Sequence, residues 1–272
     1  MFPVQDVQFA LYIQHLADTT KSKAAVEVAV NAISWAHQMA GLQPISSSPF
    51  VRAVLAGLQR QLAKPIAKKE PITVEMLAAM VCSSDGSLAD LRLMSMALLA
   101  FSAFLRCDEL IKLRVCDVSF AAESMTISLP KSKTDQYRDG SAVVVACSGT
   151  QTCPVTMLEK YFKKAALSCG STDLVFRGIV HTKAGERLRK VGGLSYSRVR
   201  ELMLQRLASL GFDAAAFGMH SFRAGGATAA ANAGVPDCLF KRHGRWRSES
   251  AKDGYVKDTE QSRLSVSQSL DL

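Results

Sequence analysis

Apolar residues recur at helical spacing along the first part of the chain. Residues 4–17, 24–39 and 50–62 each place apolar side chains three or four positions apart, which predicts amphipathic helices. Ser46, Ser47, Ser48 and Pro49 form a break that can cap the helix that follows them. We therefore predict a bundle of three or four helices. Residues 64–71 are charged, contain two prolines and form the best linker in the chain.

The pattern becomes mixed after this linker. Thr73 can cap a new helix, and residues 88–104 and 107–113 continue with helical periodicity. Residues 124–129 and 142–147 alternate as β-strands do, with residues 130–140 as the loop between them. Pro154 suits the first turn of a helix that runs to about residue 166, residues 174–176 form a short strand candidate, and the remainder is mainly helical. The prediction is a mainly α fold with a small antiparallel β-sheet.

Composition narrows the class of protein. A chain of 272 residues can bury a sizeable core and suggests two domains. Its net charge of +9 favours a polyanionic partner such as nucleic acid. The seven cysteines show no disulfide-framework spacing, which predicts free thiols in a reducing compartment. No apolar run reaches the roughly 20 residues needed to span a bilayer, and the start lacks the basic residues of a secretory signal.

Metal and cofactor motifs are absent from the sequence. Cys147 and Cys153 lie six residues apart and His181 follows, but no second pair at zinc spacing completes a site. There is no HExxH motif, no carboxylate cluster for magnesium, no Walker loop and no GxGxxG after a strand. We expect no metal and no cofactor, which disfavours a metal-dependent nuclease or an ATP-driven transposase.

Five residues together could act on a phosphodiester. His220 and Arg223 lie three positions apart at the start of a predicted helix, so both can reach one anion, which the helix N-terminus also attracts. Trp246 adds a ring N–H donor, and the hydroxyl of Tyr255 can act as a nucleophile. Arginine suits phosphate because its guanidinium stays protonated and binds two oxygens at once. A second arginine is expected upstream, and Arg106, at the end of an apolar helix, is the candidate.

Each of these residues also has an ordinary structural interpretation. Alone, Arg106 would be a surface arginine in an ion pair, and His220 a structural histidine. Trp246 alone would be a core or DNA-facing aromatic, and Tyr255 an ordinary tyrosine in a Gly-Tyr turn. The functional interpretation rests on the occurrence of all of them in order.

These segments resemble the tyrosine recombinases, the family of phage integrases and Xer-type recombinases. LLAFSAFLRCDELIKLRVCDV resembles their first catalytic box, MHSFRAGGATAAANAG their second, and HGRWRSESAKDGYVKD the end of their site. The steps of 26 residues from His220 to Trp246 and 32 from Arg223 to Tyr255 fit the family spacing. The resemblance covers roughly residues 71–258 and looks closest to recombinases of eukaryotic mobile elements, the DIRS-like and Crypton-like groups.

The resemblance implies a mechanism without metal or ATP. Arg106, His220, Arg223 and Trp246 would bind the scissile phosphate, and Tyr255 would attack it to form a 3′-phosphotyrosyl link. In the family, the loop between two strands also delivers a lysine that protonates the leaving 5′ oxygen.

Lys133 matches that lysine best, with Lys131 in reserve, although the loop could be an ordinary basic hairpin that touches the DNA backbone. Glu109 could support a neighbouring donor or be a solvated helix charge.

The sequence departs from the family pattern just before Trp246. The residue before this donor is usually glycine, but here it is Arg245, and His243 is displaced to a position where it becomes a rival donor. Lys241, Arg242, Arg245 and Arg247 surround this segment and are interpreted as DNA phosphate anchors.

The resemblance also implies an organisation and partners. Residues 1–66 would form a helical core-binding domain, residues 67–258 the catalytic domain, and residues 259–272 a tail that docks on a neighbouring subunit or is simply a frayed terminus. The expected partners are double-stranded DNA and further copies of the chain, as a tetramer on two DNA sites, with no membrane. The expected place is the nucleus of a eukaryote, or otherwise the cytoplasm or nucleoid. The alternatives are a catalytically silent, domesticated DNA-binding protein and a type IB topoisomerase.

Overall fold

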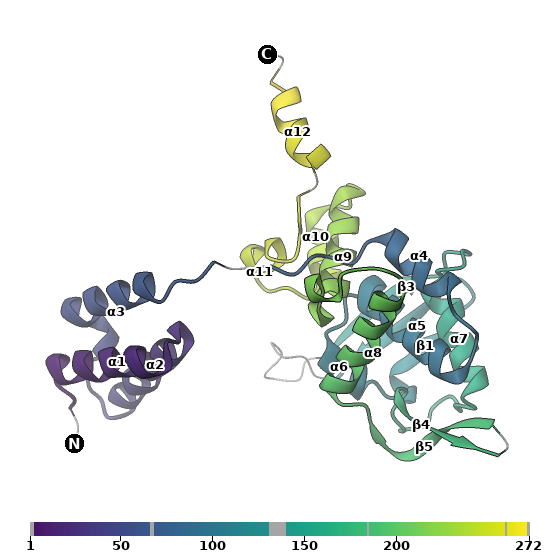
Figure 1. The fold of residues 1–272 in the computed structure, drawn as a ribbon, viewed down its shortest axis with the longest axis horizontal. Coiled ribbons are helices and arrows are strands. Elements are labelled where there is room, and N and C mark those ends of the chain that lie inside the picture. The colour runs from purple at the N-terminus through teal and green to yellow at the C-terminus, as the bar shows by residue number, and fades with distance from the viewer. Residues whose placement is uncertain (1–2, 66–67, 131–139, 184, 259, 271–272) are drawn as a thin grey trace. The chain divides into compact units, whose positions relative to one another are not determined.

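The computed structural model describes residues 3–65, 68–130, 140–183, 185–258 and 260–270 of the chain (Figure 1). The chain divides into two compact units, residues 1–68 and residues 69–272.

The first unit is a small helical bundle. Its elements are α1 (Asp6–Thr20), α2 (Lys23–Met39), the 3-10 turn η1 (Ile45–Ser47) and α3 (Pro49–Gln61). The Ser22 and Ser48 side chains accept hydrogen bonds from backbone amides in the first turns of α2 and α3, and Pro49 occupies the first turn of α3. A core of Phe9, Ile13, Val26, Val30, Val51 and Leu58 joins the three helices. The predicted helices of this segment are confirmed.

The second unit is mainly helical and carries both sheets. Its helices are α4 (Val74–Cys82), α5 (Leu88–Ser102), α6 (Cys107–Lys112), α7 (Pro154–Lys164), α8 (Tyr196–Ser209), α9 (Met219–Asn232), α10 (Asp237–Gly244), α11 (Glu249–Asp253) and α12 (Glu260–Gln268), with 3-10 turns η2 (Val115–Asp117) and η3 (Ala214–Ala216).

Helix α5 is the centre of this unit. It is apolar nearly all round and is buried along most of its length, as expected of a helix that has neighbours on every side. It packs against α7 on one side and α9 on another (Figure 1). Gly225 and Gly226 of α9 allow this approach, because a Cβ atom at Gly226 would meet the Phe101 carbonyl of α5 at 2.0 Å. The end of α5 and the start of α9 are thus held close together.

The strands form two small antiparallel sheets. The first contains β1 (Val118–Phe120), β2 (Ser124–Leu129) and β3 (Ser141–Ala146) in that order, with Met125 opposite Val145. The second pairs β4 (Arg177–Thr182) with β5 (Gly185–Gly193). The predicted mainly α fold with a small antiparallel sheet is confirmed, and β1 and the second sheet were not predicted.

One predicted strand is wrong. Residues 174–176 do not form a strand, because Leu174 makes only an isolated bridge to Arg114, and the strand begins at Arg177. The β4–β5 hairpin replaces the predicted helical continuation. Its residues are largely charged or glycine and mostly solvent-exposed, so they show neither the apolar alternation nor the turn signal by which a strand pair is found. Within the described residues, no helix is long and apolar enough to cross a membrane.

Candidate functional site

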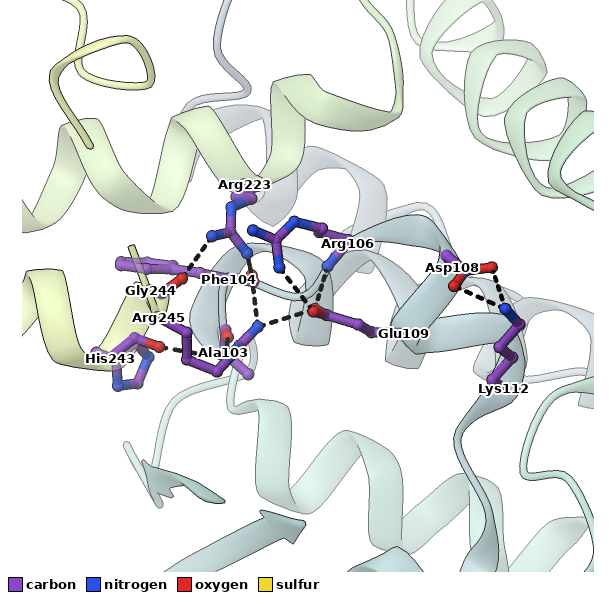
Figure 2. Close-up of polar contacts among 10 residues, drawn as sticks. All are labelled: Ala103, Phe104, Arg106, Asp108, Glu109, Lys112, Arg223, His243, Gly244 and Arg245. Atoms are coloured by element: carbon purple, nitrogen blue, oxygen red, sulfur yellow. Dashed lines mark hydrogen bonds and ion pairs between the residues drawn. The ribbon is translucent and has the colours of Figure 1, made fainter. Parts of the chain in front are cut away.

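The turn between α5 and α6 positions Arg106. Phe104 adopts a left-handed backbone conformation with φ of 49°, which directs the chain sharply out of α5. Arg106 then caps α6 with extended backbone, and its amide donates to Glu109 Oε2 at 2.8 Å. The Arg106 side chain donates from Nη1 to Glu109 Oε1 at 2.9 Å (Figure 2). Glu109 is buried and accepts hydrogen bonds from both the backbone amide and the side chain of Arg106.

Arg223 lies in the interior beside this turn. Its side chain has no solvent exposure, and Nη1 and Nη2 donate to the carbonyls of Phe104 and Gly244 (Figure 2). Its Nε is buried without an acceptor among the described residues. Burial, and then the neighbouring guanidiniums of Arg106 and Arg245, lower the pKa of Arg223. A bound anion would stabilise the protonated guanidinium and offset both effects, so this position favours an anionic ligand.

Two aromatic residues cover Arg223. Its Cζ lies 4.7 Å from the centroid of the Trp246 ring and 5.1 Å from that of the Tyr255 ring. Trp246 is buried and its ring centroid is 5.5 Å from that of Tyr255, which is half-buried. Trp246 Nε1 is buried and has no acceptor in the described part of the chain. An unpaired donor next to a buried arginine is costly without a ligand and suits an anion-binding site.

His220 approaches the same tyrosine from α9. Its ring is exposed and stands edge-on to the Tyr255 ring, with 6.2 Å between centroids. His220 and Arg106 also line a pocket of about 630 Å³ whose wall includes Tyr196, at the start of α8. The structure therefore brings together Arg106, His220, Arg223, Trp246 and Tyr255. Tyr196 was missed, and no motif in the sequence distinguishes it.

His243, the rival donor, is directed elsewhere. Its Nε2 donates to the Ser102 carbonyl at 2.7 Å, and its ring packs edge-on against Phe104 with 4.8 Å between centroids. Burial lowers the pKa of His243, so the ring is neutral near neutral pH. The contacts place His243 in the support of the α5–α6 turn.

The basic residues around Trp246 are divided between surface and interior. Arg242 and Arg247 are exposed, and Lys241 forms an ion pair with Glu249. The Arg245 side chain, interpreted from the sequence as a DNA phosphate anchor, is only 8% exposed, and its Nη2 donates to Glu109 Oε2 at 2.8 Å (Figure 2). Lys131 and Lys133 lie outside the described residues.

The arrangement can bind and polarise a phosphate. The guanidinium of Arg223, the indole of Trp246 and the imidazole of His220 lie around one phenol, and Arg106 lines a pocket together with His220. These groups are a set of donors for an anion beside a nucleophile. Within the described residues, no group of three or more His, Cys, Asp or Glu side chains is placed to hold a metal ion.

Comparisons with known proteins identify the class. Residues 71–262 match the phage integrase family. The chain is 28% identical over 251 residues to the integrase/recombinase xerD homolog of Selenomonas ruminantium, across 90% of this chain and 71% of that protein. The XerA recombinase structure matches 98% of this chain and 83% of its own, with a TM-score of 0.56 and 15% identity. A Tn1549 transposon integrase structure, solved with transposon right end DNA, matches 99% of this chain and 86% of its own, with a TM-score of 0.64 and 11% identity.

Fold and sequence thus agree on a tyrosine recombinase. The chain belongs to the phage integrase family.

Proposed function

We propose that this protein cuts and rejoins DNA strands at specific sites through Tyr255. The observation that carries the proposal is the position of the Tyr255 ring, 5.1 Å from the Arg223 guanidinium carbon and 6.2 Å from the His220 ring centroid. A phenol has a pKa of about 10 and is a weak nucleophile in water. Beside a phosphate held by arginines, it faces an electrophile whose negative charge is already neutralised.

Arg106 and Arg223 are the proposed phosphate ligands. Both guanidiniums are fixed before any substrate arrives, one by Glu109 and the other by two backbone carbonyls. Donors held in place stabilise the charge that develops on the pentacoordinate phosphorus without having to reorganise. His220 and Trp246 add neutral or positive donors at the same phosphate. This accounts for the buried, unpaired Trp246 Nε1.

The chemical step replaces one ester bond to phosphorus by another, so the phosphate remains a diester. The Tyr255 oxygen forms a bond to phosphorus and loses its proton to water, while the bond from phosphorus to the 5′ oxygen breaks. Lys133 or a water protonates the departing 5′ oxygen, which leaves a 3′-phosphotyrosyl link and a free 5′-hydroxyl. The 5′-hydroxyl of a partner strand reverses the step and releases Tyr255. The covalent link conserves the bond energy, so the reaction needs neither ATP nor a metal.

We also propose how the DNA is held. Residues 1–66 and 67–258 would contact the duplex as core-binding and catalytic domains, with Lys241, Arg242 and Arg247 on phosphates. Exchange between two duplexes needs four tyrosines, hence a tetramer, with residues 259–272 docking on a neighbour. The XerH recombinase and the Tn1549 integrase, both similar in fold, were solved with difH substrate and with transposon DNA. By analogy, the biological role is mobilisation of a genetic element.

Covalent trapping tests the function. The protein and its Tyr255→Phe variant are incubated in EDTA with terminal DNA of the host element, nicked near the scissile phosphate. We expect a denaturant-stable protein–DNA adduct with the unchanged protein only. Binding at low salt without any adduct would overturn the proposal in favour of a silent DNA-binding protein. Adducts on any duplex, together with relaxation of supercoiled plasmid by the monomer, would instead indicate topoisomerase activity.

A further inference from the structure

Arg245 occupies a backbone conformation that its residue type does not favour. It ends α10 with φ of 56° and ψ of 39°, in the left-handed region, where helices commonly end on glycine. A side chain that is kept at such a position costs free energy unless its contacts compensate.

All those contacts of the Arg245 guanidinium but one lie at the turn between α5 and α6. Nη2 donates to Glu109 Oε2 at 2.8 Å and to the Phe104 carbonyl at 3.3 Å, and Nη1 donates to the Ala103 carbonyl at 3.3 Å (Figure 2). The remaining bond, from Nη1 to the His243 carbonyl at 3.2 Å, lies within its own segment. Arg245 thus connects the segment that leads to the tyrosine with the turn that holds Arg106.

The same residue adjusts the charge of the site. Glu109 would otherwise direct both carboxylate oxygens at Arg106, but one of them, Oε2, also accepts from Arg245. Counting Arg106, Arg223 and Arg245 as +3 and Glu109 as −1, the buried cluster carries a net charge of +2. The carboxylate therefore fixes the cluster without cancelling its attraction for a phosphate.

We propose that Arg245 is a positioning residue for strand cleavage. Its guanidinium holds Trp246, the next residue, and through it the Tyr255 ring in register with Arg106 and Arg223, and it never touches DNA itself. The part of this inference that concerns cleavage rests on the proposed function. The part that concerns the placement of Trp246 stands on the contacts of Arg245 alone.

Fluorescence tests the placement without DNA. The chain has two tryptophans, so replacing the exposed Trp35 by Phe leaves Trp246 as the only reporter. Arg245→Gly then removes the guanidinium and also relieves the left-handed backbone. Ala166→Gly is the matched control, because Ala166 is exposed and has φ of 51° but contributes no buried guanidinium. We expect Arg245→Gly, but not the control, to shift Trp246 emission to the red and to increase its quenching by acrylamide.

Single-turnover trapping tests the effect on cleavage. With saturating nicked DNA, we expect the adduct to form about a hundredfold more slowly in Arg245→Gly, because a misplaced reactive group costs rate. We expect little change in Kd, because the donors of the Arg245 guanidinium are directed at Glu109 and backbone carbonyls. Millimolar guanidinium should restore part of the rate by filling the vacated site. The rate of adduct formation in Arg245→Lys should lie between those of the unchanged protein and Arg245→Gly, because an ammonium keeps the positive charge but lacks the planar fork that serves several acceptors.

The outcomes separate the two proposals. Unchanged Trp246 fluorescence in Arg245→Gly overturns the positioning role, whether or not any adduct forms. Altered fluorescence with an unchanged cleavage rate overturns its role in the reaction. An unchanged protein that forms no adduct refutes the proposed function, and the fluorescence result still decides whether Arg245 places Trp246. A third outcome also refutes the positioning role. If the rate of adduct formation falls and guanidinium does not restore it, while folding is impaired and DNA affinity is altered, Arg245 serves only the general stability of the protein.

Discussion

Gly244 is the residue at which a single methyl group should disturb the site most directly. A Cβ atom there would lie 1.9 Å from Cζ3 of Trp246 and 2.2 Å from Cε3. Carbon atoms in contact are about 3.5–4.0 Å apart, so in Gly244→Ala the indole ring must retreat by about 1.5 Å or more. The φ angle of Gly244 is not in the left-handed region, so the backbone itself accepts alanine and the effect is steric. The Gly244 carbonyl also accepts from Arg223, which couples the displacement to that guanidinium.

The expected cost follows from overpacking. Inserting a methyl group into a packed interior destabilises by about 1–3 kcal/mol. For a chain of this size, each kcal/mol lowers the Tm by about 2–4 °C. We therefore expect Gly244→Ala to lower the Tm by about 2–12 °C. We also expect it to slow adduct formation strongly, because the displaced ring lies against both Arg223 and Tyr255.

Thermal unfolding followed by circular dichroism, and single-turnover trapping, measure the two effects. Gly254→Ala is the control, because its Cβ atom would have its nearest contact at 3.4 Å, with the Ser250 carbonyl. The Tm of Gly254→Ala should differ from that of the unchanged protein by only a small fraction of the change seen in Gly244→Ala. If Gly244→Ala instead keeps both the Tm and the rate of the unchanged protein, Trp246 does not lie where the contacts place it, and the reasoning is refuted.

Three further predictions concern neighbouring groups. Burial lowers the pKa of His243 below its ordinary 6.5, so below pH 6.5 the unfolded chain binds a proton more readily than the folded chain does. Stability should therefore decrease as the pH is lowered through this range. In a Tm series from neutral pH to about pH 5, the Tm of His243→Asn should fall less steeply than that of the unchanged protein. The Sγ atoms of Cys147 and Cys153 lie 3.5 Å apart. Burial opposes ionisation of Cys153, but hydrogen bonds from a threonine of α7 and from backbone amides lower its pKa to about 6. The oxidant diamide should therefore join them, removing two of the seven free thiols, and a titre that stays at seven would contradict this. Lys252→Met should loosen α11 and slow adduct formation, because Lys252 pairs with Glu249 at 3.0 Å; a wild-type rate at unchanged Tm would count against it.

The helices that carry the candidate site could be predicted because their signals are local. The apolar run of α5 and the His-x-x-Arg spacing of α9 each depend on residues within a few turns of one another. The β4–β5 hairpin has no such signal, since Arg177, Arg187 and Arg189 replace the apolar alternation of a strand. Lys133 stays a prediction, because the described residues do not include it.

The inward direction of Arg245 could not be predicted for a different reason. Its partner Glu109 is 136 residues away, and a run of basic residues beside an aromatic is typical of an exposed phosphate anchor. Nothing within the segment distinguishes Arg245, whose side chain is 8% exposed, from Arg247, which is exposed. Only the tertiary approach of α10 to the α5–α6 turn makes the distinction.

The buried arginines also explain why this site can be assembled before DNA binds. Isolated guanidiniums in an apolar interior would be strongly unfavourable, and three of them repel one another. Here Glu109 balances one charge, and the carbonyls of Phe104 and Gly244 accept the donors of Arg223. Burial, and then the neighbouring positive charges, lower the pKa of Arg223, and the excess of positive charge stays uncompensated in the free protein. A phosphodiester supplies the missing negative charge, so the same groups that make the empty site costly make phosphate binding, and still more its doubly charged transition state, favourable.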